Sequence, residues 1–199
     1  MAARELTGKQ SSPTAGVIDS QSVKTTESGG IRGFDAGKKI NVRKRHIVVD
    51  TLGLMVGLVI HSAGIQDRDG APGVLKTILK RWPWLRHIFA DGGYAGPKLK
   101  GWLEKVGKFT LEIVKRSDQT EGFESLPRRW VVERTFAWLG RCRRLARNFE
   151  KTISSSEAWI YIASIRFLRE GSQEPDIVTF IMIQDLRLFE TLELTRQTE

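Results

Sequence analysis

The chain has 199 residues, of which 40% are apolar and 28% are charged. That length supports one domain of ordinary size, and the composition excludes wholesale disorder and fibrous repeats. Lysine and arginine outnumber aspartate and glutamate by 32 to 23, and the net charge of +9 favours a polyanionic partner such as nucleic acid. The longest apolar-rich stretch, residues 52–63, is shorter than the ~20 residues of a membrane-spanning helix, so we expect no membrane partner.

Composition divides the chain into three parts. Residues 1–14 are polar and carry no hydrophobic period, which predicts a disordered lead-in. Residues 171–199 hold six acids against two arginines, and this shift predicts a divergent acidic tail after a basic body over residues 15–170. Because the start carries no secretory signal and the single cysteine cannot form an internal disulfide, we expect a cytoplasmic protein.

The pattern of apolar residues and turn signals predicts five strands followed or separated by helices. The predicted strands lie at residues 17–24, on both sides of a turn within residues 46–64, at 86–90 and at 109–115. Helices are predicted within residues 66–82, 97–107, 127–149 and 154–170. The economical architecture for this order is an α/β fold in which helices pack on a mixed five-stranded sheet.

Two aspartates, Asp19 and Asp91, are candidate functional residues because of their positions in the predicted strands. Asp19 lies inside the first predicted strand, where an unpaired carboxylate is costly. Asp91 follows the fourth strand at the start of a glycine turn, the place where open sheets with helical crossovers bind ligands. An ordinary strand-ending turn is the simpler interpretation of Asp91 taken alone.

Glu133 is the third candidate carboxylate. A helical wheel places it opposite the apolar face of the predicted helix, beside small residues and near Arg129 and Arg144. This arrangement leaves room for a phosphate backbone next to a metal held by the glutamate, while arginines bind the phosphates. The alternative is a solvated face on which arginines pair with Glu133, an interaction worth ~0–1 kcal/mol.

Three segments carry a specific family resemblance: VIDSQSVK around Asp19, FADGGYAG around Asp91, and RRWVVERTFAWLGRCRRLARNFE around Glu133. Together with KRHIVVDTLGL and QDRDGA, they resemble the catalytic domain of DDE-type insertion-sequence transposases of the insertion-sequence-five group. The resemblance implies a ribonuclease-H-like fold with Asp19, Asp91 and Glu133 as catalytic and metal-binding residues. It also implies two divalent cations, Mg²⁺ or Mn²⁺, that activate the attacking oxygen and stabilise the leaving oxygen during DNA cleavage and strand transfer.

The resemblance has two kinds of departure. In the family's tyrosine-arginine-glutamate-lysine signature, Arg129 matches, but Leu126 stands at the tyrosine position and Gly140 at the lysine position. Only about 15 residues precede the first predicted strand, so we expect the N-terminal helical region that recognises element ends to be missing. A catalytically inactive DNA-binding remnant and a nuclease of the same fold therefore remain the alternatives.

Basic residues near these motifs are the candidates for DNA contact. The cluster in residues 38–45 fits either a DNA-backbone patch or a solvated strand edge, and the charge of the body favours DNA. The partner expected is double-stranded DNA, both element ends and target, bound by a homo-oligomer associated with the bacterial nucleoid. The candidate DNA-binding residues are Lys38, Lys39, Arg43, Lys44, Arg45, Arg129, Arg134, Arg141, Arg143 and Arg144.

Overall fold

The computed structural model describes residues 2–27, 30–35, 38–114 and 129–171. The predicted tail beyond residue 171 and Leu126 lie outside these ranges. The chain divides into two compact units, residues 12–160 and a second unit formed by residues 1–11 with 161–199. The first unit contains the whole sheet and every candidate site residue; the second contains the short helix α1 (Ala2–Glu5).

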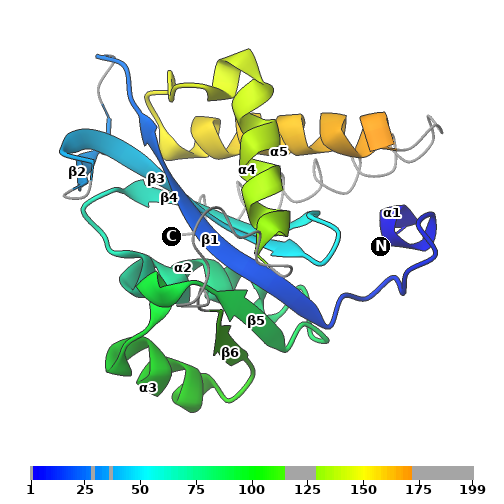
Figure 1. Cartoon of the computed structure of the whole chain (residues 1–199). Helices are drawn as coiled ribbons and strands as arrows, with labels where there is room; N and C mark the ends of the chain where they lie inside the picture. The colour runs from blue at the N-terminus through cyan, green and yellow to red at the C-terminus, as the bar shows by residue number, and fades with distance from the viewer. Residues whose placement is uncertain (1, 28–29, 36–37, 115–128, 172–199) are drawn as a thin grey trace, which may run out of the picture. The chain divides into compact units, whose positions relative to one another are not determined.

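An antiparallel half of the sheet is centred on β3 (Ile40–Asp50) (Figure 1). One side of β3 pairs with β1 (Ala15–Lys24) along nine residue pairs. Its other side pairs first with β2 (Gly33–Asp35) and then with β4 (Met55–Ser62), so these two strands share one edge. Because β3 has partners along both edges, it is longer than the sequence predicts and begins at Ile40.

The other half of the sheet is parallel. β1 pairs with β5 (His87–Ala90), and β5 pairs with β6 (Thr110–Ile113). Parallel neighbours need crossover connections, which α2 (Asp67–Leu79) and α3 (Pro97–Val106) provide before and after β5. The expected mixed sheet with helices packed on it is confirmed, and it is consistent with a ribonuclease-H-like α/β fold. The described residues form six strands, because the short β2, which the sequence does not predict, shares one edge of β3 with β4.

Helices cover both faces of this sheet. Figure 1 shows α2 and α3 on one side and α4 (Trp130–Arg141) on the other. The apolar face of α2, including Val74, Leu75 and Ile78, is fully buried in the main core. Within the described ranges, no helix is long and apolar enough to cross a membrane.

Helix α4 is shorter than the sequence predicts. It ends at Arg141, and Cys142 has extended backbone angles before a single 3-10 turn, η2 (Arg143–Leu145). The chain leaves the helix to return to the sheet, where the Asn148 N–H donates to the Lys24 carbonyl at 2.8 Å. Cys142 is half-buried and follows the last residue of the helix.

Gly70 shows how closely α2 packs on the sheet. A β-carbon at this position would lie 2.7 Å from His61 Nε2 and 2.8 Å from His46 Nδ1. These two ring nitrogens are hydrogen-bonded to each other at 3.3 Å. Because this bond holds both rings in place, they cannot easily move aside for a methyl group. In most helices a glycine costs ~1 kcal/mol relative to alanine, but here only a glycine fits.

We expect Gly70→Ala to lower the free energy of unfolding by ~1–3 kcal/mol because the added methyl overpacks the histidine pair. Gly73→Ala is the matched control, since a β-carbon there meets nothing within 4 Å in the same helix. It should raise the free energy of unfolding by ~0.5–1 kcal/mol. Urea denaturation of the three proteins tests this, and stabilisation by both substitutions would contradict the packing described.

Candidate active site

Asp19 lies in the middle of β1, opposite Ile47 of β3. Its Oδ1 atom accepts the backbone N–H of Ser20 at 2.7 Å. Burial raises the pKa of Asp19 to about 6; the Ser20 hydrogen bond opposes that shift, and the nearby negative charge of Asp91 adds to it. The fold thus keeps this carboxylate in an environment that disfavours its ionised form.

Asp91 directly follows β5 and caps η1 (Gly92–Tyr94), its Oδ1 accepting the Gly93 N–H at 2.8 Å. In the parallel register of β1 and β5, Val17 is opposite Phe89. Asp19 and Asp91 each come two residues after these partners, so the two aspartates reach the same edge on neighbouring strands. The sheet itself therefore brings together two carboxylates that are 72 positions apart.

Glu133 comes from the exposed face of α4, as the helical wheel predicts; Val132, Phe136 and Leu139 on the opposite face are buried. Arg129, one turn earlier, links it to the sheet. The Arg129 Nη2 atom lies 3.6 Å from Glu133 Oε1 and 3.6 Å from Asp91 Oδ2. One guanidinium thus stands between two of the three predicted carboxylates.

The three carboxylates share one region but do not form a compact ligand cluster. In the described part of the chain, no three Asp, Glu, His or Cys side chains lie close enough to hold one metal ion. The Arg129 cation separates Asp91 from Glu133, and its charge also acts on Asp19. The assignment of Asp19, Asp91 and Glu133 as ligands of shared metal ions therefore stays a prediction.

Asp67 also belongs to this region. Its Oδ1 atom accepts the Ser20 hydroxyl at 2.5 Å and the Lys44 ammonium at 2.9 Å. Burial raises the pKa of Asp67, but these hydrogen bonds outweigh it and the net shift is downward. Its Oδ2 atom would lie 3.5 Å from a β-carbon at Gly93, on the turn that carries Asp91. Sequence spacing alone gives no signal for this contact, because its partners come from β1 and β3.

A buried chain of hydrogen bonds runs behind the aspartates. His61 Nδ1 lies 2.8 Å from the Ser62 carbonyl, so it carries the proton and leaves Nε2 to accept from His46 Nδ1. The second nitrogen of His46 then accepts the Tyr94 hydroxyl at 2.8 Å. Burial, followed by the proximity of His61, lowers the pKa of His46 to about 3, which keeps the ring neutral. This series of hydrogen bonds fixes the side chain of Tyr94, which belongs to η1, the turn that follows Asp91.

The candidate DNA-binding residues separate into two groups. Lys38, Lys39, Arg134, Arg141, Arg143 and Arg144 are exposed. Arg43, Lys44 and Arg45 are buried in β3, contrary to the expectation of an exposed patch there. The physical reason is that β3 is an interior strand, and its cations are used within the protein. Arg129 is mostly buried, with a side chain 19% exposed.

The family of the chain follows from comparison with known proteins. Residues 10–168 match the family model described as "Transposase DDE domain". Because this match covers most of the chain, the chain belongs to the transposase DDE domain family. It is also 30% identical over 115 residues to a Burkholderia cepacia protein described as "Putative transposase for insertion sequence element IS402". The chain spans about half the length of that relative, 54%, and the match covers 54% of this chain.

We expect Asp19→Asn to stabilise the metal-free protein at pH 8, because it removes a buried charge. The folded-state pKa of about 6 lies above the unfolded value of 3.8, so ionisation of Asp19 opposes folding. That penalty is complete above pH 6 and disappears as pH falls to about 4. The gain from the substitution should shrink over the same window, measured by urea denaturation at several pH values. Destabilisation by Asp19→Asn at pH 8 would contradict the assigned environment.

Proposed function

We propose that this chain is the catalytic domain of an insertion-sequence transposase of the insertion-sequence-five group. It hydrolyses DNA phosphodiesters at element ends and transfers the freed 3′ ends to target DNA. The observation that carries the proposal is the parallel register of β1 and β5, which sets Asp19 beside Asp91 at one sheet edge. Glu133 is linked to that edge through Arg129, and all three residues lie within residues 10–168, which match the family model.

The proposal needs divalent cations, and the donor chemistry of the site fits them. Asp19, Asp91 and Glu133 offer carboxylate oxygens, the ligands that Mg²⁺ and Mn²⁺ prefer. Burial, with a smaller contribution from the negative charge of Asp91, raises the pKa of Asp19, and a bound cation would favour its ionised form. When bound, divalent cations would supply Lewis-acid activation of the attacking oxygen and charge neutralisation at the leaving oxygen.

The chain's own residues would prepare the site for DNA. The N–H groups of Ser20 and Gly93 hold one oxygen each of Asp19 and Asp91. The second oxygen of Asp19 is left for a cation, whereas that of Asp91 lies 3.6 Å from Arg129 Nη2. Arg129 competes with a cation for Asp91 and Glu133, and its planar guanidinium suits a phosphate oxygen pair equally well. We infer that DNA binding draws Arg129 from the carboxylates to the phosphate backbone.

The proposed substrate is double-stranded DNA, and we expect copies of the chain to assemble on it as a homo-oligomer. A second candidate is an inactive DNA-binding remnant of a degraded element. It is favoured by the lack of a three-ligand metal cluster among the described residues and by Gly140 at the lysine position of the family signature. A nuclease of the same fold differs from both because it cuts DNA without ever joining the cut end to new DNA.

We expect Glu133→Gln to abolish Mn²⁺- or Mg²⁺-dependent nicking of DNA while leaving DNA affinity within about twofold, because the amide keeps the size but loses the charge. Glu104→Gln, on the exposed face of α3, is the matched control and should leave nicking unchanged. Gel analysis of supercoiled plasmid measures nicking, and strand transfer is read as joined products. Metal-dependent nicking that persists in Glu133→Gln would remove this residue from the site, and no nicking by the unaltered chain would favour the remnant.

DNA affinity should fall steeply with salt, because each phosphate contact by a cation contributes roughly −0.9 to the log–log slope. Replacing the exposed Arg141 and Arg143 by glutamine should flatten the slope by up to ~1.8, the sum for two contacts. Arg81 is an exposed arginine two residues beyond the end of α2, and the control Arg81→Gln should leave the slope unchanged. Fluorescence anisotropy from about 50 to 200 mM salt measures the slopes. Equal slopes for the double variant and the control would show that Arg141 and Arg143 do not contact DNA phosphates.

A further inference from the structure

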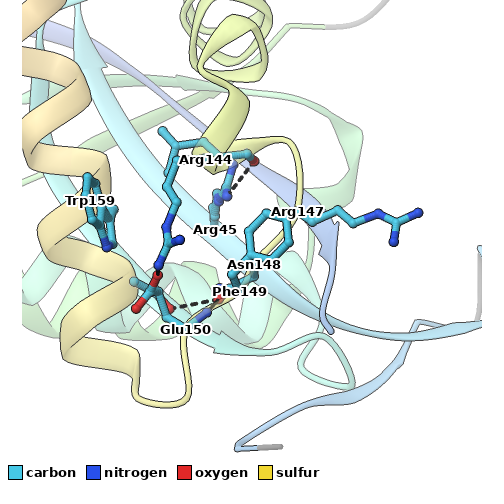
Figure 2. Close-up of a pocket in the computed structure, with 9 residues that line it drawn as sticks. Arg45, Arg144, Arg147, Asn148, Phe149, Glu150 and Trp159 are labelled. Carbon is cyan, nitrogen blue, oxygen red and sulfur yellow. Dashed lines mark hydrogen bonds and ion pairs between the residues drawn. The ribbon is translucent and has the colours of Figure 1, made fainter. Parts of the chain in front are cut away.

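The polar side chains between η2 and the beginning of α5 (Ile153–Gly171) enclose only a small hollow (Figure 2). Its interior measures about 10 Å³, which is room for one water molecule, and Arg144 in its lining is already paired with Glu150. This cluster is therefore closed to larger ligands. A second polar cluster, centred on Tyr94, lies next to the candidate carboxylates and can act on the site.

The hydroxyl group of Tyr94 donates its one proton to a pair of histidines. The residue is 1% exposed, and its hydroxyl oxygen lies 2.8 Å from His46 Nε2. Because His46 donates its own proton from Nδ1 to His61, its Nε2 atom can only accept. The Tyr94 oxygen therefore keeps only lone pairs for its other neighbours.

Those other neighbours include the aspartates of the site. Burial raises the pKa of Tyr94 well above its usual value. The negative charges of Asp19, Asp67 and Asp91 raise it further, and a hydrogen bond with the Ser20 side chain opposes the shift. A hydroxyl that donated its proton to a carboxylate would weaken the attraction of that carboxylate for a cation. Since the histidine pair takes the proton, Tyr94 does not compete with a cation for the aspartates.

The sheet alone does not fix the distance between the carboxylates of Asp19 and Asp91. The parallel pairing of β1 with β5 ends at Val17 and Phe89, two residues before these aspartates. Beyond that point β1 is still paired with β3 on its other side. The turn that carries Asp91 has left the pairing, so another contact must hold it against β1.

Tyr94 makes that contact. Its backbone N–H donates to the Asp91 carbonyl at 3.2 Å and closes the turn η1. Its hydroxyl group bonds to His46 of β3, which lies opposite Ser20 of β1 in the sheet. The Ser20 N–H in turn donates to Asp19 Oδ1 at 2.7 Å. One side chain thus connects the Asp91 turn to the two strands that hold Asp19 in place.

We propose that Tyr94 is a positioning residue of the candidate site: it holds the Asp91 turn against β1, so that Asp19 and Asp91 are preset to bind one divalent cation together. This role rests on the proposed function and deepens it, because it assigns the spacing of the carboxylates to a side chain that need not touch DNA. Groups that hold metal-binding side chains in place commonly contribute about 10- to 100-fold to metal affinity. Mg²⁺ depends most on such spacing, since it demands near-ideal octahedral geometry, whereas Ca²⁺ accepts flexible geometry.

The test compares the unaltered chain with Tyr94→Phe, which keeps the ring and removes the hydroxyl group. Free Mn²⁺ measured by electron paramagnetic resonance gives the Mn²⁺ affinity of each DNA-free protein, and displacement of Mn²⁺ gives the affinities for Mg²⁺ and Ca²⁺. We expect Tyr94→Phe to bind Mg²⁺ about tenfold more weakly and Ca²⁺ less than about threefold more weakly. Tyr161→Phe removes the chain's other phenol hydroxyl, in α5, and is the matched control that should leave both affinities unchanged.

Loss of folded protein would weaken the binding of both cations equally, so the ratio of the two losses separates positioning from unfolding. Equal losses, or an unchanged Mg²⁺ affinity in Tyr94→Phe, would overturn the role of Tyr94 and leave the proposed function in place. Mn²⁺ binding that survives in Asp19→Asn would put the cation elsewhere and overturn both. The expected ratio in a chain that does not nick DNA would contradict the proposed catalysis alone.

A second measurement needs no variant. Hydrogen exchange of the Tyr94 backbone N–H is followed by NMR in the unaltered chain before and after Mg²⁺ is added. If Tyr94 presets the turn, this N–H is protected without a cation, and Mg²⁺ slows its exchange by less than about threefold. Slowing by about tenfold or more would show that the cation orders the turn, which would overturn the role of Tyr94.

Discussion

The candidate site depends first on the parallel pairing of β1 with β5. This pairing, together with the register that sets Val17 against Phe89, brings Asp19 and Asp91 to one edge of the sheet. A shift of one residue would send one of the side chains to the opposite face, because neighbouring residues of a strand point in opposite directions. The antiparallel pairing of β1 with β3 on its other side holds that register, and α2 and α3 make the parallel connections possible.

A second constraint comes from Arg43, whose hydrogen bonds fix the path of the segment that follows α4. Its fully buried guanidinium donates to the backbone carbonyls of Ile31, Glu150 and Lys151 and to the side chains of Asn148 and Ser156. These acceptors are neutral, so the cation is held by hydrogen bonds rather than by an ion pair. Such an arrangement is costly to disturb, since each lost acceptor leaves a buried N–H unsatisfied. It ties the segment after α4 to β3.

The four carboxylates of the site do not all have a cation nearby. Asp67 has Lys44, while Asp91 and Glu133 share Arg129. Asp19 is the most deeply placed of the four, and no cation lies within ion-pair distance of it among the described residues. Its raised pKa follows from that position. Perturbed carboxyl groups of this kind gather at functional sites, where folding stability is given up for later binding of a cation or substrate.

From local periodicity, the sequence by itself predicted the order of strands and helices along the chain, apart from the short β2, and the exposed position of Glu133. The mixed sheet followed from that order of elements. It also singled out Asp19 and Asp91, whose roles remain proposals. Three features were decided only by the tertiary structure. The burial of the cations of β3 depends on strands pairing with both of its edges and on a distant loop folding over it. The end of α4 at Arg141 depends on the return of Asn148 to β1, and the place of Asp67 depends on Ser20 and Lys44. In each case the deciding partners come from other elements of the fold, and local periodicity carries no information about such pairing.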